Sequence, residues 1–132
     1  MQRRRSHKYN VAAPEARRWN GRLYASKAER EYAQQLHFLL ESHVIQLIQE
    51  QPTLSLGVPE NVYRPDFRVV QDGEERYIDV KGVETAMFRR ACKLWAAYGP
   101  APLHIIKKKG ARFITDRVIG KGQNAASGVT AK

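Results

Sequence analysis

The stretch Tyr63–Gly82 constrains the fold most, because it has the pattern of a β-hairpin. Both arms carry β-branched and aromatic residues, and Asp72-Gly73 between them is a strong signal for a tight hairpin turn. Side chains alternate along a strand, so Tyr77, Asp79 and Lys81 should share one face while the residues between them point to the other. We therefore predict a hairpin with one wet, charged face and one dry face.

The same alternation on the first arm groups Asp66 with Arg68. If the arms pair so that Asp66 and Asp79 lie on the same side, two carboxylates and the Lys81 amine converge. Carboxylate oxygens are the ligands that Mg²⁺ prefers, and such a group suits metal-assisted phosphodiester hydrolysis. Alternatively, the aspartates are strand-end carboxylates paired with Arg68 and Lys81 on a solvated face. The order Pro-Asp followed by Asp-x-Lys on the next strand favours the first interpretation.

Length and charge narrow the function classes. The chain has 132 residues, which suits one domain, and its 23 Lys and Arg against 13 Asp and Glu give a net charge of +10. Such an excess indicates a polyanionic partner, with nucleic acid as the leading candidate and a membrane surface as a weaker one. The single cysteine, Cys92, excludes an internal disulfide framework, and no secretory h-region is present. We expect a cytoplasmic protein without a membrane span.

The first 25 residues should form a basic arm and a short hairpin. The arm is expected to lack a helix because of Pro14, and two functions stay open for it: a grip on backbone phosphates, or a solubilising tail. Asn20-Gly21 predicts a tight turn, around which Trp19 and Tyr24 serve packing. The basic residues of the arm are Arg3, Arg4, Arg5, Lys8, Arg17 and Arg18.

A helix should begin at Ser26, where Ser-Lys-Ala-Glu has the capping-box pattern. Ala28, Tyr32 and Leu36 follow at helical spacing and predict the apolar stripe that packs on the sheet. Glu29 lies beside this stripe. Two roles stay open for Glu29: it caps the helix, or it leans over the hairpin as a third carboxylate of the site. Glu31 is a weaker candidate for this third carboxylate.

The remaining elements alternate between strand and helix patterns. One strand, or two broken at Pro52, should span Val44–Leu56 and point four side chains inward, which are Ile45, Leu47, Leu54 and Leu56. A helix should span Thr85–Tyr98 and end at Gly99-Pro100, with an inner face of Phe88, Ala91 or Cys92, Trp95 and Tyr98.

Two short strands should follow this helix, at Leu103–Lys107 and Arg112–Thr115, joined by a basic turn. This turn and the outer face of the preceding helix are candidate nucleic-acid contacts, although each alone is also typical of a solvated charge cluster. Their residues are Arg89, Arg90, Lys93, Lys107, Lys108 and Lys109. From residue 119 onward we expect a disordered tail.

Together, these residues resemble a known family. Pro65-Asp66, then Asp79-Val80-Lys81, with Glu29 on a preceding helix, is similar to the PD-(D/E)xK nuclease superfamily, and within it to archaeal-type Holliday-junction resolvases and small phage-encoded nucleases of that kind. Ala28-Glu29-Arg30-Glu31 resembles their first-helix signature. Tyr77–Lys81 resembles their catalytic strand. The similarity spans roughly residues 26–115.

The resemblance implies a single α/β domain at residues 26–118 with a restriction-endonuclease-like core, a central mixed sheet flanked by helices. It implies that Glu29, Asp66 and Asp79 bind Mg²⁺, or Mn²⁺ in its place, together with the Val80 carbonyl. Lys81 would act on the attacking water. These four side chains, Glu29, Asp66, Asp79 and Lys81, would be the catalytic group.

The resemblance also implies the substrate and the assembly. Arg30 would contact phosphate, and a homodimer would present two active sites to the paired strands of a four-way DNA junction, in the host cytoplasm if the chain is phage-encoded. This chain departs from the resolvase pattern in having Asp79 where glutamate is usual, and in the added arm and the segment around Pro52.

Three functions therefore stay open. The first is a metal-dependent, structure-selective DNA endonuclease that resolves Holliday junctions, and the second is another PD-(D/E)xK nuclease of the nicking, repair or restriction type. The third is a basic nucleic-acid-binding module without catalysis. Metal dependence separates the third from the first two, and selective cutting of junctions separates the first from the second.

Overall fold

The computed structural model describes residues 11–120, which form a small mixed α/β domain with three helices and a five-stranded central sheet. This confirms the predicted fold class. The elements in chain order are α1 (Pro14–Arg17), β1 (Arg18–Trp19), β2 (Arg22–Leu23), α2 (Lys27–Glu41), β3 (Leu47–Glu50), β4 (Leu54–Ser55), β5 (Val62–Tyr63), β6 (Phe67–Gln71), β7 (Glu74–Val80), α3 (Ala86–Tyr98), β8 (Leu103–Lys109) and β9 (Arg112–Ile119).

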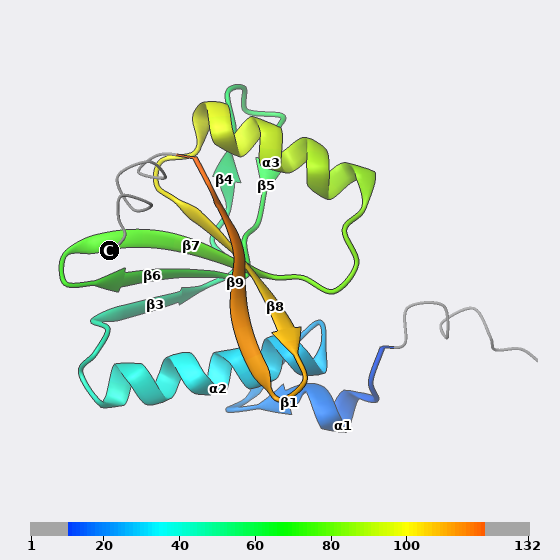
Figure 1. Cartoon of the computed structure of the whole chain (residues 1–132), viewed down its shortest axis with the longest axis vertical. Coiled ribbons are helices and arrows are strands. Elements are labelled where there is room, and N and C mark those ends of the chain that lie inside the picture. Colours follow the sequence, from blue (N-terminus) through cyan, green and yellow to red (C-terminus); the bar gives the residue numbers. More distant parts are fainter. Residues whose placement is uncertain (1–10, 121–132) are drawn as a thin grey trace, which may run out of the picture.

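The central sheet has the order β3-β6-β7-β8-β9. Strands β7 and β8 are parallel, and the other neighbours are antiparallel. A parallel pair needs a crossover connection, which here is α3. Figure 1 shows α2 on one side of the sheet and α3, with the small β4–β5 hairpin, on the other. The sheet is therefore covered on both faces.

The β6–β7 hairpin is confirmed. Asp72 and Gly73 have φ of 52° and 82°, the left-handed backbone that a two-residue hairpin turn with matching strand twist requires. The turn fixes the register, in which Phe67 lies opposite Ile78. The N-terminal hairpin follows the same rule, with φ of 53° at Asn20 and 77° at Gly21.

Helix α2 begins where the sequence predicts, with the Ser26 side chain accepting a hydrogen bond from the Glu29 amide at 3.0 Å. Its buried residues are Glu29, Ala33 and Leu36, spaced at i, i+4 and i+7. The predicted stripe is confirmed at Leu36, which is buried, and at Tyr32, which packs against the same core, while Ala28 is only partly buried. Glu29 lies beside this stripe, as predicted, and is buried together with it.

Each face of the sheet has its own hydrophobic core. On the α2 face, Leu36 packs with Phe67 and Ile78, and on the α3 face Trp95 packs with Tyr77. The rings of Tyr77 and Trp95 meet edge-on, with centroids 5.0 Å apart. The prediction of a wet, charged face was wrong, because Tyr77 is 5% exposed and Asp79 is 1% exposed under α3.

Several smaller predictions were also wrong. Pro14 opens helix α1, since a proline at the first helical position gives up no intrahelical hydrogen bond. Leu47 is 38% exposed, and Tyr98, whose ring lies against Gly57, is 57% exposed and so does not belong to the inner face of α3. Strand β9 extends to Ile119, which pairs with Leu103, so this residue belongs to the sheet and not to the tail.

Some predictions fall outside the described residues. They concern the basic arm residues Arg3, Arg4, Arg5 and Lys8, and the tail beyond residue 120. Within residues 11–120, none of the helices has the length and apolar character that crossing a bilayer requires.

Candidate active site

Asp66 and Asp79 lie side by side on neighbouring strands. The register that pairs Phe67 with Ile78 brings the residue before β6 opposite Asp79. Two hydrogen bonds fix the carboxylates: the Asp66 amide donates to Asp79 Oδ1 at 3.0 Å, and the Val80 amide donates to Asp66 Oδ2 at 2.8 Å. Each aspartate is thus held by the backbone of the opposite strand. This is the convergence that the hairpin pattern predicted.

Glu29 approaches this pair from α2. The residue is 4% exposed, and the negative charges of both aspartates raise the pKa of its carboxyl group. Burial is the largest cause of the upward shift in the Glu29 pKa. The three acids that the sequence separates by up to fifty positions therefore lie within electrostatic reach of one another.

Burial also dominates the electrostatics of the two aspartates. It raises the pKa of Asp79 to about 7, and it raises the pKa of Asp66 as well. Lys81 acts in the opposite direction on both, because its positive charge favours the ionised carboxylates. A carboxyl group with a raised pKa at a strand end is typical of functional sites.

The donor chemistry of this cluster fits a hard divalent cation. Asp79 Oδ2 is fully buried and has no hydrogen-bond partner within the described chain, which is costly for a carboxylate oxygen. As the side chains stand, no group of three or more His, Cys, Asp or Glu residues between 11 and 120 is arranged to hold a metal ion. One oxygen of each aspartate accepts a backbone hydrogen bond, so metal binding would use the other oxygens and a turn of the Glu29 side chain.

Lys81 follows β7 directly and is half-buried. Its amide donates to the Ile106 carbonyl at 2.9 Å, and its Nζ lies 4.5 Å from the centre of the Phe88 ring. The residue also lines a pocket of about 400 Å³ with Lys107, Lys108 and Lys109. Lys81 therefore lines this lysine-rich pocket, which we call the lysine pocket, while its charge acts on Asp66 and Asp79.

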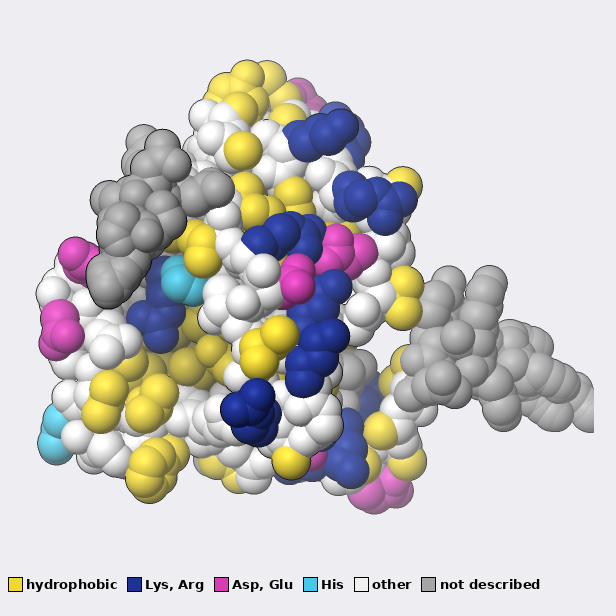
Figure 2. Space-filling model, viewed as in Figure 1, with side chains coloured by type: hydrophobic (Ala, Val, Ile, Leu, Met, Phe, Trp, Pro, Cys, Tyr) yellow, Lys and Arg dark blue, Asp and Glu magenta, His cyan; other side chains and the backbone are white. Residues whose placement is uncertain are grey.

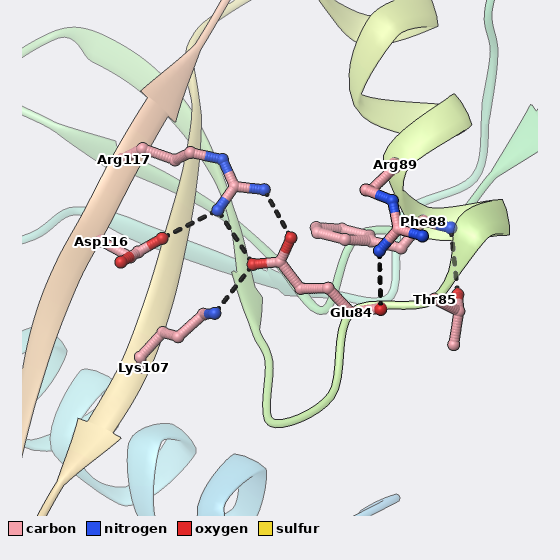
Figure 3. Close-up of polar contacts among 7 residues, drawn as sticks. All are labelled: Glu84, Thr85, Phe88, Arg89, Lys107, Asp116 and Arg117. Atoms are coloured by element: carbon pink, nitrogen blue, oxygen red, sulfur yellow. Dashed lines mark hydrogen bonds and ion pairs between the residues drawn. The ribbon is translucent and has the colours of Figure 1, made fainter.

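The structure shows an ion-pair network beside the site that the sequence analysis missed. Glu84 accepts from Arg117 Nη2 at 2.8 Å and from Lys107 Nζ at 2.8 Å, and Arg117 also pairs with Asp116 (Figure 3). These contacts tie the segment between β7 and α3 to β8 and β9. Glu84 and Arg117 are 33 positions apart, so no local pattern could have revealed the pair.

Some of the predicted phosphate contacts pair with other groups of the protein, and others are exposed on its surface. Arg30 is engaged internally, with its Nε donating to the Ala16 carbonyl at 3.0 Å, and Lys108 pairs with Glu31. Figure 2 shows Lys and Arg side chains in a band that runs from α3 down over β8 and β9. On α3 the exposed basic residues are Arg89, Arg90 and Lys93. Of the arm, the described residue Arg17 donates to the Ala12 and Tyr24 carbonyls and so has a structural role.

The fold and site define a class: a small α/β domain with a buried carboxylate cluster at the edge of a basic surface. By sequence, the chain belongs to the family described as a protein of unknown function (DUF1064), whose profile matches residues 6–110. The matched region includes Glu29, Asp66, Asp79 and Lys81. No curated protein matches the chain.

Proposed function

We propose that the protein is a divalent-metal-dependent endodeoxyribonuclease of the PD-(D/E)xK type. The observation that carries this proposal is the locked pair of Asp66 and Asp79, with Glu29 and Lys81 within electrostatic reach. A purely structural pair of aspartates would be expected to have all its carboxylate oxygens hydrogen-bonded, whereas Asp79 Oδ2 has no hydrogen-bond partner among the described residues, and of their charges only that of Lys81 acts to favour the ionised form of Asp79. The unsatisfied charge is what a bound cation would balance.

In this proposal, Glu29, Asp66 and Asp79 hold Mg²⁺ or Mn²⁺, with the Val80 carbonyl as a further ligand. The ion would supply Lewis-acid polarisation of the scissile phosphate. The Asp79 and Asp66 carboxylates are oriented in advance by their backbone hydrogen bonds. The Lys81 ammonium would donate a hydrogen bond to the attacking water or to a phosphate oxygen, and its contact with the Phe88 ring supports this role by limiting its movement.

Branched DNA is the proposed substrate, and a four-way junction is its leading form. The net charge of +10 and the lysine pocket beside the carboxylates support a polyanionic ligand. Paired cleavage of a junction would need two active sites, so we propose a homodimer that works in the cytoplasm. Phosphate contacts by the lysines would position the DNA without reading its sequence.

The test is a cleavage assay that compares a four-way junction, a fork, a nicked duplex and a plain duplex, each with and without Mg²⁺. We expect metal-dependent paired cuts in the junction and little cutting of the plain duplex. Site-specific cutting of the plain duplex would instead favour a restriction-like nuclease. DNA binding that is indifferent to Mg²⁺, with no cleavage of any substrate, would contradict the proposal and leave a binding module.

A further inference from the structure

A second pocket lies on the other side of Lys81. It has a volume of about 320 Å³ and opens between the β4–β5 hairpin and α3. Its lining is largely apolar and aromatic, and includes Leu56, Tyr63, Met87, Phe88, Ala91 and Leu94. Met87 at its edge is 82% exposed, so the apolar lining continues to the surface of the protein. We call this cavity the α3 pocket.

The α3 pocket and the lysine pocket meet at Lys81, which lines both. One side of this residue is therefore flat and apolar, and the other carries Lys107, Lys108 and Lys109. Arg90 adds a further positive charge at the lining of the α3 pocket. A ligand that fits both must join a planar apolar part to an anionic part over a short distance, and a nucleotide has this chemistry.

We infer that the α3 pocket receives one unstacked nucleobase of the DNA whose backbone phosphate lies in the lysine pocket. This inference rests on the proposed function and names its substrate class. Aromatic side chains are the usual platforms for unpaired bases, and the half-buried Tyr63 ring lines the pocket, whereas the buried Phe88 ring supports the Lys81 amine beside it.

The inference predicts which forms of DNA bind most tightly. A base within a continuous duplex is stacked on both sides, so its entry would cost several kcal/mol of unstacking, whereas a base at a branch point or in a single strand is already free. Substrates with an unpaired nucleotide next to the scissile bond should therefore bind more tightly than plain duplex. A second copy of this chain is a poor occupant, because a two-fold contact would bring the Lys81 and Arg90 charges of both copies together.

The experiment fills the pocket and measures binding in the absence of divalent metal, so that catalysis plays no part. Ala91→Trp places a large side chain in the pocket, and Ala96→Trp on the same helix is exposed and serves as the matched control. The probes are a labelled fork with unpaired strands and a plain duplex of equal charge. We expect Ala91→Trp to weaken fork binding about tenfold and to leave duplex binding unchanged. Ala96→Trp should bind both like the parent.

Met87→Ser provides a second variant at an exposed position that does not endanger folding, and it should weaken fork binding by about threefold. Equal affinity of the parent for fork and duplex, or an unchanged fork affinity in folded Ala91→Trp, would overturn the inference while metal-dependent cleavage could still support the nuclease. Sedimentation of the parent and of Ala91→Trp tests whether a second copy of the chain fills the pocket. A parent dimer that Ala91→Trp abolishes would also overturn the inference. If the parent binds neither DNA, the proposed function itself fails.

Discussion

Asp79 and Glu84 lie within one short segment of the chain and have opposite electrostatics. The Asp79 carboxyl is 1% exposed, has an oxygen without a partner, and has a pKa raised to about 7 by burial. The Glu84 side chain is 17% exposed, and its hydrogen bonds to Arg117 and then to Lys107 lower its pKa. The Glu84 carboxylate is paired with two cations, whereas burial of Asp79 disfavours its charged form. The comparison shows that Glu84 is a paired acid that supports the fold, and under the proposed function Asp79 is the acid that binds the ligand.

The largest expected effect is on cleavage. Asp79→Asn should reduce the rate of metal-dependent cleavage by at least about a thousandfold, because several kcal/mol of phosphate activation depend on the bound ion. Asp66→Ala, Asp79→Ala and Lys81→Ala should have similar effects on single-turnover cleavage while DNA affinity stays close to that of the parent. Glu84→Gln is the matched control and should cleave normally. Equal losses in Asp79→Asn and Glu84→Gln would remove the distinction between the two acids.

The same pair of variants should move thermal stability in opposite directions. Without divalent metal at pH 8, Asp79→Asn removes an unpaired buried charge and should raise Tm by roughly 5 °C. Glu84→Gln breaks partly exposed ion pairs and should lower Tm by about 1–3 °C. Calorimetry on the two variants measures both shifts. A fall in Tm for Asp79→Asn would mean that the carboxylate stabilises the fold as Glu84 does.

The pH dependence follows from the raised pKa of Asp79. Between its usual value of 3.8 and about 7, the folded protein keeps a proton that the unfolded chain releases. The free energy of unfolding should therefore fall as pH rises through this window, and the penalty should be complete above it. Because Mg²⁺ competes with that proton, its stabilising effect should be larger at pH 8 than at pH 5. A rise in stability between pH 4 and 7 that Asp79→Asn abolishes would contradict this sign.

How much of the site could be predicted from the sequence depended on the range of the interactions. A two-residue turn at Asp72-Gly73 fixes the register, so the opposition of Asp66 and Asp79 follows from the spacing alone. The Ser26 cap was predicted for the same local reason. Glu29 was identified as a candidate at the edge of the apolar stripe, but the spacing left open whether it serves as a cap alone or leans over the hairpin, and it did not predict that Glu29 is buried.

The burial of Asp79 could not be predicted because it depends on contacts between distant elements. Trp95 on α3 covers Tyr77 on β7, and this converts the expected wet face into a second core. The Glu84–Arg117 pair joins the segment before α3 to the last strand and has no local signature. The extension of β9 to Ile119 likewise depends on pairing with Leu103 across the sheet. Hairpin registers can thus be read from sequence, whereas the partners that crossover elements bring together cannot.

The smallest expected effect concerns the lysine pocket. Lys109→Ala should weaken DNA binding uniformly across sequences and reduce the slope of log affinity against log salt by about 1, since one phosphate contact is lost. Lys107, which already pairs with Glu84, should contribute less than Lys109. Titrations of both variants at several salt concentrations measure the two slopes. Unchanged slopes in both would show that DNA does not use this pocket.

The central claim is that Glu29, Asp66 and Asp79 form a divalent-metal site. Anomalous diffraction from crystals of the protein soaked in Mn²⁺ tests it most directly. We predict one peak at metal–oxygen bonding distance, about 2.0–2.2 Å, from oxygens of Asp66 and Asp79, and its loss in Asp79→Asn. A peak absent from these carboxylates, or found only at Glu84, would contradict the account.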